Sequence, residues 1–282
     1  MSVRGAVVGH VEWVTFARVP RVPGPGEIAR ARESWREAAG GGAVAAAEMA
    51  RLAATPNDAL FFTAIGTGDA GRAVRTTLDD REHALFAAAR AEAHPRVFTL
   101  LDDDEGERTI TVLAPPLSPR GADALAWNEL DDVDGVYFCK GDRDAVHHAR
   151  RARILVATAR ALGVLREARV RVDVLVRSAR DAGEAYSPGD LDPAPLAVVE
   201  TEGADGGSYE TATGERGRFA AIPLTEPLAD TYGAGDSFAA ALTWGLAEGR
   251  PLEEALRFAA ERGAAALARH GADRAHSIAR SP

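Results

Sequence analysis

The most informative segment of the sequence reads Asp230-Thr-Tyr-Gly-Ala-Gly-Asp-Ser-Phe-Ala-Ala-Ala-Leu242. Its Gly233-Ala-Gly235 turn comes directly before an alanine-rich run that predicts a helix, and Asp236 stands at the helix start. Successive backbone N–H groups in such a turn can point at an anion, and the helix dipole adds positive potential there. Phosphoryl transfer requires this pairing, because the amides stabilise the moving phosphoryl group while the carboxylate takes a proton from the attacking hydroxyl. The spacing alone also fits a glycine-rich turn capped by an aspartate.

Outward from this segment, predicted strands and helices alternate along the chain. We expect strands near residues 5–9, 60–65, 135–139, 172–176 and 196–200, and helices near 43–54, 70–80, 143–161, 236–247 and 252–268. Such alternation predicts a three-layer α/β/α fold with a mostly parallel central sheet. Two β-type stretches, approximately 11–38 and the hairpin 96–113, interrupt the rhythm and predict a small separate β lid. No linker divides the chain, so we expect one domain over residues 1–282.

The composition excludes several classes of protein. The chain has 282 residues and a formal net charge of −9. Its one basic cluster, at 150–153, is predicted to lie on an exposed helix face. A nucleic-acid partner is therefore not expected. Cys139 is the only cysteine, no run approaches 18 apolar residues and the start has no signal-peptide core, which predicts a cytoplasmic protein without a membrane partner. Lys140 is the only lysine, so neither a Walker A loop nor the protein-kinase lysine pattern is present.

The segment around Asp236 resembles the C-terminal signature of the ribokinase-like (PfkB-type) carbohydrate kinase family, Asp-Thr-x-Gly-Ala-Gly-Asp-Ser-Phe. The resemblance extends along most of the chain. Further motifs similar to those of the family are Pro23-Gly-Pro-Gly-Glu27, Gly41-Gly42, Thr201-Glu-Gly203-Ala-Asp-Gly206 and Arg269-His-Gly-Ala272. The resemblance implies the ribokinase-like three-layer fold and an ATP-dependent kinase that transfers the γ-phosphoryl group to a hydroxyl of a sugar or sugar-like molecule.

The resemblance also implies roles for individual residues. Asp236 would be the general base, with Gly233, Ala234 and Gly235 as the anion hole. The remaining implied contacts are with ATP at Thr201, Gly203, Gly206 and Gly271, with substrate at His10, Glu12, Gly41 and Gly42, and with metal at Asp181, Asp230 and Tyr232. Magnesium would accompany ATP, and a potassium ion, if one is used, would bind at Asp230 and the Tyr232 carbonyl. Lids in the family often pair between subunits, which implies a homodimer.

Three departures from the family pattern concern the acceptor and the metal. The family often has an aspartate five residues after the first-strand glycine, where this chain has Val14, and Glu12 is the nearest acid. The asparagine of the first-signature helix is missing, and the family's Asn-x-x-Glu corresponds to Ser178-Ala-Arg-Asp181. The acceptor therefore stays open among sugars, sugar phosphates, nucleosides and pyrimidine alcohols. A non-catalytic nucleotide- or sugar-binding sensor on the same fold is the alternative of another class.

Other polar and glycine-rich motifs need a separate interpretation. Gly66-Thr-Gly-Asp-Ala-Gly71 matches the dinucleotide pattern Gly-x-Gly-x-x-Gly, but on a later strand than usual. His147 and His148 are adjacent, so they point to different faces of a predicted helix and are expected on its exposed surface. Lys140 follows the predicted strand 135–139 and is a candidate for a role near phosphate.

Overall fold

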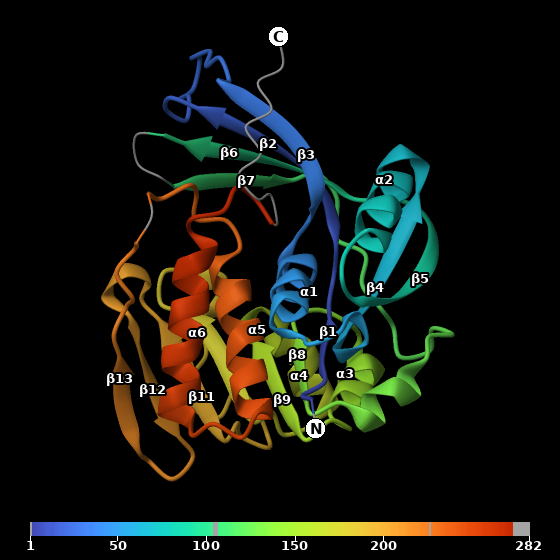
Figure 1. Cartoon of the computed structure of the whole chain (residues 1–282), viewed down its shortest axis with the longest axis vertical. Coiled ribbons are helices and arrows are strands. Elements are labelled where there is room, and N and C mark those ends of the chain that lie inside the picture. Colours follow the sequence, from blue (N-terminus) through green and yellow to red (C-terminus); the bar gives the residue numbers. More distant parts are fainter. Residues whose placement is uncertain (1, 104–106, 226, 273–282) are drawn as a thin grey trace.

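The computed structural model describes residues 2–103, 107–225 and 227–272. Within them, the larger of two sheets has the strand order β13-β12-β11-β10-β9-β8-β1-β4-β5 (Figure 1). The strands are β1 Gly5–Val8, β4 Ala59–Thr67, β5 Ala84–Ala93, β8 Gly135–Phe138, β9 Ile154–Thr158, β10 Val174–Ser178, β11 Ala197–Thr201, β12 Gly207–Thr211 and β13 Arg216–Phe219. Every pair from β5 to β11 in that order is parallel, whereas β12 and β13 continue the sheet antiparallel. Parallel strands bring their carboxyl ends to one edge, where α/β proteins bind ligands.

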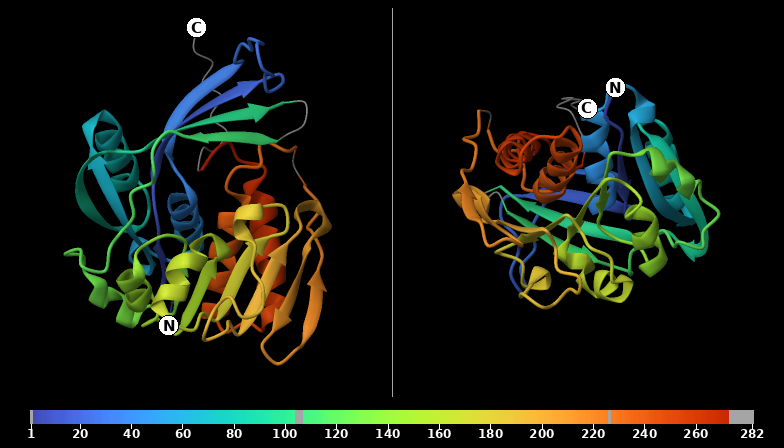
Figure 2. Two further views of the ribbon diagram at one scale, coloured as in Figure 1. Left: turned by 180° about the vertical axis from the view of Figure 1, so that it is seen from behind. Right: turned by 90° about the horizontal axis from the view of Figure 1, so that it is seen from below.

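Helices cover both faces of this sheet, which confirms the predicted three-layer fold (Figures 1 and 2). One face carries α1 (Gly41–Leu52), α2 (Gly68–Asp79), α5 (Ala234–Ala247) and α6 (Leu252–Ala266), and the other α3 (Arg143–Ala149) and α4 (Leu162–Ala168). Successive strand residues point to opposite faces, so Val7 joins the core under α1 and α5 while Val8 joins the core under α3 and α4. In the described part of the chain, none of the helices is long and apolar enough to cross a membrane.

A second, four-stranded sheet lies over the edge of the larger sheet at which α5 begins (Figure 1). Its order is β3-β2-β6-β7, from β2 Glu12–Val19, β3 Glu33–Ala39, β6 Arg96–Asp102 and β7 Arg108–Val112. Val14, Phe16, Val97 and Leu101 form a small core on its inner side together with Tyr232. Tyr232 precedes α5, so this core connects the second sheet to the glycine turn. The expected turn of the β6–β7 hairpin lies partly outside the described residues.

The predicted helix over 143–161 is wrong. Helix α3 ends at Ala149, and the following apolar run is the buried strand β9. The Arg150 guanidinium fills the break, since it donates to three backbone carbonyls and pairs with Asp173 at 2.7 Å. The arginine cluster therefore stabilises a connection between elements and is not an exposed helix face.

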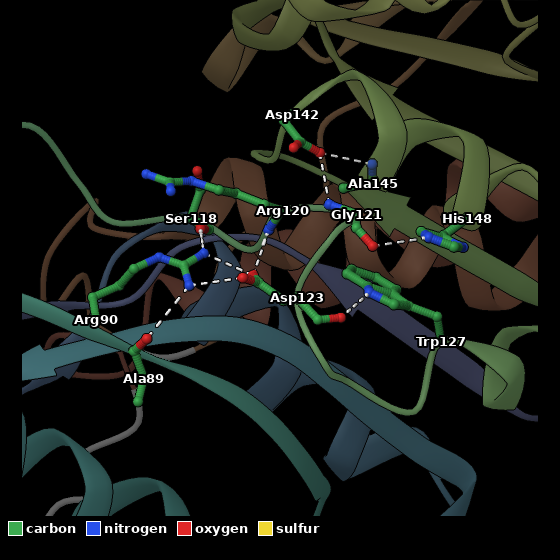
Figure 3. Close-up of polar contacts among 10 residues, drawn as sticks. All are labelled: Ala89, Arg90, Ser118, Arg120, Gly121, Asp123, Trp127, Asp142, Ala145 and His148. Atoms are coloured by element: carbon green, nitrogen blue, oxygen red, sulfur yellow. Dashed lines mark hydrogen bonds and ion pairs between the residues drawn. The ribbon is translucent and has the colours of Figure 1, made fainter.

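The loop that returns from β7 to the larger sheet is held by a network of polar contacts (Figure 3). The Arg90 guanidinium donates to both carboxylate oxygens of Asp123, at 2.8 and 2.7 Å. The Asp142 carboxylate accepts from Gly121 N and from Ala145 N, both at 2.8 Å, so it joins this loop to the start of α3. The segment between β8 and α3 is thereby fixed in position.

His147 and His148 differ in their surroundings. His147 is exposed, as predicted, whereas His148 is half-buried. The His148 ring stacks on Trp127, with ring centroids 4.7 Å apart, and its Nε2 lies 3.2 Å from the Gly121 carbonyl (Figure 3). The prediction of an exposed surface is therefore wrong for His148, which packs against the loop that precedes β8.

Candidate active site

Helix α5 begins directly after Gly233, whose φ of 75° is the left-handed conformation that favours glycine. No side chain caps this helix start, and the first turn closes with a hydrogen bond from Ser237 N to the Gly233 carbonyl at 2.9 Å. Within the described part of the chain, the N–H groups of Ala234, Gly235 and Asp236 therefore have no protein acceptor. A side chain at Gly235 would meet nothing within 4 Å, so the space in front of the turn is open. These amides are free to bind an anion.

The Asp236 carboxylate lies next to this turn, between Tyr137 of β8 and Gly41 at the start of α1. Its Oδ1 is 3.3 Å from the Tyr137 hydroxyl, and a Cβ built on Gly41 would lie 2.8 Å from the same oxygen. Burial, followed by the neighbouring Glu184 carboxylate, raises the pKa of Asp236 to about 6, while the Arg108 guanidinium opposes the shift. Such a group is mostly ionised at pH 7 and still basic enough to accept a proton, which suits a general base.

The glycines at 40–42 bring the start of α1 against the predicted acceptor residues. A Cβ on Gly40 would lie 3.3 Å from Glu12 Oε2 and 3.3 Å from His10 Nε2. One on Gly42 would lie 2.5 Å from the His10 carbonyl oxygen, closer than side chains pack. The structure therefore brings the predicted substrate residues together, and glycine allows the start of α1 to lie this close to His10 and Glu12.

His10 and Glu12 lie close to Lys140. His10 follows β1, Glu12 begins β2 and Lys140 follows β8. Burial raises the pKa of Glu12 to about 7, although the Lys140 ammonium lowers it. Burial, followed by Lys140, lowers the pKa of His10 to about 4, so its ring is neutral near pH 7. His10 Nδ1 is enclosed and has no hydrogen-bond partner in the described part of the chain. An unpaired buried polar atom is costly, and burial of the ring keeps His10 in its neutral form.

Three of the predicted nucleotide residues lie at the carboxyl end of β11, whereas Gly271 lies after α6, where its N donates to Asp230 Oδ2. Thr201 ends the strand, and Gly203 and Gly206 follow in a turn with φ values of 67° and 82°. A side chain at Gly206 would collide with the Phe219 carbonyl, and one at Gly203 would press on the Arg180 guanidinium. The conformation of the turn therefore explains both glycines, and the turn opens at the same sheet edge as α5.

Asp230 anchors the segment that precedes the glycine turn. Its Oδ1 accepts from Tyr232 N at 2.8 Å, and its Oδ2 accepts from Gly271 N at 2.9 Å. The Arg18 guanidinium of β2 donates to the adjacent Ala229 carbonyl at 3.0 Å. Burial raises the pKa of Asp230, whereas the two amides and then Arg18 lower it. The two amide hydrogen bonds make Asp230 an anchor between the segment before α5 and the segment after α6. Each carboxylate oxygen keeps a second lone pair, so potassium binding at Asp230 and the Tyr232 carbonyl stays a prediction.

Two more side chains of the second sheet reach the same region. Arg108 of β7 donates to the carbonyl and to the hydroxyl of Thr231, both at 3.0 Å. Glu37 of β3 accepts from Ala272 N at 2.8 Å. The second sheet therefore contacts the segments on either side of the Asp230 anchor, and through Arg108 it adds positive charge near Asp236.

Asp181, the predicted metal residue, lies near Glu184 beyond the end of β10. Arg160 pairs with both carboxylates, at 2.9 Å to Glu184 Oε1. Ser178 N donates to Glu184 Oε2 at 2.7 Å, and Glu184 is the nearby carboxylate that raises the pKa of Asp236. In the ranges that the structure describes, no three His, Cys, Asp or Glu side chains converge to hold a metal ion.

Four residues around Asp236 were missed by sequence reasoning, namely Tyr137, Arg160, Glu184 and Arg108. The sequence did contain a signal for Glu184. Asp181 and Glu184 have the same three-residue spacing as the asparagine and glutamate of the family's Asn-x-x-Glu motif. The others stand in no motif, and the fold alone brings them to Asp236.

The Gly66-Thr-Gly-Asp-Ala-Gly71 motif has a packing role. A side chain at Gly71 would collide with the Gly66 carbonyl, and Gly66 N donates to His94 Nδ1 at 3.1 Å. The glycines therefore allow α2 to start close against β4. The motif follows β4, next to β1 in the sheet, and these contacts give no support to dinucleotide binding.

A parallel sheet with an uncapped helix start, a half-buried aspartate and a second sheet above them defines the class of ribokinase-like small-molecule kinases. Solved structures share this fold. Ribokinase from Thermotoga maritima matches with a TM-score of 0.75 and 22% identity, covering 96% of this chain and 94% of that one. Arabidopsis thaliana ribokinase, complexed with ribose and ATP, matches with a TM-score of 0.71 and 19% identity, covering 95% and 93%.

Sequence similarity identifies the family within this class. Residues 193–278 match the family described as pfkB family carbohydrate kinase. The chain is 30% identical over 290 residues to an ATP-dependent ribose-1-phosphate kinase of Halopiger xanaduensis, with 96% of this chain and 94% of the relative covered. The chain therefore belongs to the pfkB family of carbohydrate kinases. It is a phosphotransferase that uses an alcohol group as acceptor.

Proposed function

We propose that the protein transfers the γ-phosphoryl group of ATP to a hydroxyl of a sugar or sugar-like molecule, with Asp236 as the general base. The observation that carries the proposal is the placement of unbonded amides at the α5 start beside a carboxylate with a pKa of about 6. The acceptor oxygen bonds to the γ-phosphorus as the bond from that phosphorus to the bridging oxygen of ADP breaks, and Asp236 takes the hydroxyl proton. The amides of residues 234–236 stabilise the charge on the phosphoryl oxygens.

We expect the nucleotide to bind between the turn after β11 and the start of α5, with contacts at Thr201, Gly203, Gly206 and Gly271. Magnesium bound to ATP would neutralise phosphate charge, and it usually keeps several water ligands in such sites. Asp181 and Glu184 would orient those waters, because their carboxylates lie at the same edge of the sheet and have the hard oxygen atoms that magnesium prefers. A potassium ion, if one is used, would bind at Asp230 and the Tyr232 carbonyl, since each Asp230 oxygen that accepts an amide hydrogen bond has a second lone pair.

The acceptor would lie between Asp236 and the residues His10, Glu12, Gly41 and Gly42. A carboxyl and a neutral imidazole can bind several hydroxyl groups by hydrogen bonds. The relatives support two kinds of acceptor, since the Halopiger protein is named for ribose 1-phosphate and the Arabidopsis ribokinase structure contains ribose. Both a sugar phosphate and a free sugar therefore enter the test below.

We also propose that the second sheet, from approximately 11–38 and 96–113, is the lid of a single domain and that it mediates a homodimer. Closing such a lid excludes water, which would otherwise compete as acceptor. The support for pairing is the edge strand β7, where Ile110 and Val112 are 44% and 54% exposed. Apolar side chains on an edge strand, which pairs on one side only, favour burial against a second copy.

Asp236→Asn tests the role of the base. Turnover should fall about 100-fold or more, because a positioned base contributes roughly 10²–10⁴ in rate, while ATP-analogue affinity should stay within about threefold. The measurement is ADP release with ribose and ribose 1-phosphate, together with calorimetric binding of a non-hydrolysable ATP analogue. Asp69→Asn is the matched control, because Asp69 also stands in the first turn of a helix but is exposed and pairs with Arg72. If Asp236→Asn turned over substrate at the wild-type rate, Asp236 would not be the general base.

A further inference from the structure

Lys140 lies close to two of the proposed acceptor residues, His10 after β1 and Glu12 at the start of β2. Strand β8 pairs in parallel with β1, and the Val8 carbonyl accepts from Cys139 N at 3.0 Å and from Lys140 N at 3.4 Å. This register places Lys140 next to His10, which follows β1 at the same edge. The Lys140 side chain is half-buried, so its charge is partly removed from bulk water.

The acids around Lys140 do not pair with it. Within the described residues, the Lys140 ammonium forms no ion pair with a carboxylate. Asp142, two residues further, accepts from two backbone amides at 2.8 Å. Asp181 and Glu184 pair with Arg160. The positive charge of Lys140 is therefore available to a ligand, and the contacts of Asp142 hold its backbone in position.

Glu12 connects Lys140 to the catalytic end of the site. Lys140 lowers the pKa of Glu12 and Asp236 raises it, so Glu12 is close to both groups. Burial leaves Glu12 partly protonated near pH 7, which prevents it from fully neutralising Lys140. The acceptor space therefore has a base at Asp236 and a positive charge at Lys140, with the hydrogen-bonding groups of Glu12 and His10 near both.

We propose that Lys140 binds an anionic group of the acceptor, and that the acceptor is a sugar that already carries a phosphate. This inference rests on the proposed function. An ammonium is a strong donor to phosphate, and Lys140 is the cation that lies beside His10 and Glu12. A hydroxyl elsewhere on the sugar faces Asp236 and becomes bonded to the γ-phosphorus as ADP leaves, and its proton passes to Asp236. The products are ADP and a sugar bisphosphate.

The test compares phosphorylated sugars with their free counterparts. ADP release is measured with ribose 1-phosphate, ribose 5-phosphate and fructose 6-phosphate, and with free ribose and fructose, at saturating ATP and magnesium. We expect the kcat/KM of the wild type for at least one sugar phosphate to exceed that for the corresponding free sugar by about tenfold or more. Lys140→Met should lower kcat/KM for that phosphate about 10- to 100-fold, mainly through KM, and should leave the KM for ATP within about twofold.

Arg171→Met is the matched control, because Arg171 is exposed and precedes β10, at the opposite edge of the parallel sheet from Lys140. Thermal unfolding of both variants shows whether they fold. If Lys140→Met lowers kcat/KM equally for free and phosphorylated sugars, or raises the KM for ATP, Lys140 serves the nucleotide and the inference is overturned. Efficient turnover of free sugars alone also overturns it and leaves the proposed function intact, whereas absence of turnover with every sugar contradicts the proposed function itself.

Discussion

At the scale of single residues, the pKa of one carboxyl group in the candidate site depends on the charge of another. Asp236 would be a weak base at its ordinary pKa, and burial together with Glu184 raises that pKa to about 6. Arg160 in turn holds Glu184, at 2.9 Å, and so keeps a second negative charge near the base. The basicity of Asp236 is therefore a property of the group of residues around it.

Glu184→Gln tests this coupling through pH dependence. The base acts when deprotonated, so kcat/KM should be full above the pKa of Asp236 and fall as the pH drops through about 6. Removing the Glu184 charge lowers that pKa, so the acid limb of the pH profile should move to lower pH. Glu254→Gln, on the exposed side of α6, is the control. An acid limb that stays in place, or moves to higher pH, would contradict the coupling.

At the scale of elements, the start of α1 shapes the space in front of Asp236. This helix begins at Gly41, where any side chain would push against the Asp236 carboxylate. The residues that follow, 43–47, are small and buried, which lets α1 lie close to α5 and to the sheet. Close packing of small residues therefore sets the position of α1 relative to Asp236, the proposed base.

Gly41→Ala should lower kcat about tenfold or more, because the added methyl group would displace the Asp236 carboxylate, and misplacement by about 1 Å can cost on the order of 100-fold. Gly163→Ala is the control within a helix, since a Cβ there meets nothing within 4 Å, and it should leave kcat unchanged and stability equal or up to about 1 kcal/mol higher. Steady-state kinetics and thermal unfolding provide both measurements. Unaltered kcat in a folded Gly41→Ala protein would show that the carboxylate accommodates the methyl group.

At the scale of the whole molecule, the second sheet is bound to the catalytic segment from several strands. Arg18, Glu37 and Arg108 come from β2, β3 and β7, and each contacts a residue between 229 and 272. A movement of the sheet would therefore pull on the Asp230 anchor and the turn before α5. This connection gives the proposed lid a direct way to affect the anion hole.

The proposed homodimer predicts a mass in solution of twice that of the chain. Val112→Asp should convert the protein to a monomer, because an ionised side chain on the β7 edge resists burial. Ile28→Asp is the control, since Ile28 is 95% exposed in the loop between β2 and β3, away from the β7 edge. Size-exclusion chromatography with light scattering measures the mass. A monomeric wild type, or a dimer that survives in the Val112 variant, would exclude pairing through this edge.

The sequence by itself determined the fold class and singled out Asp236 as the candidate base. Apolar runs alternating with helical periodicity specify a parallel sheet in three layers, and Gly233-Ala-Gly235 before a helix specifies open amides, because both are local properties of the backbone. Local patterns did not reveal β5, whose alanine-rich segment becomes a strand through pairing with β4, or β9, which lay within a predicted helix.

Only the tertiary structure decided which groups surround Asp236. Tyr137, Glu184, Arg160 and Arg108 come from separate parts of the chain, and they shift a pKa because folding removes water and brings charges within a few ångströms. Likewise, Lys140 is visible in the sequence as the only lysine, but its place beside His10 and Glu12 follows from the register of β8 on β1. Distance and burial are set by packing, and no local pattern of residues encodes them.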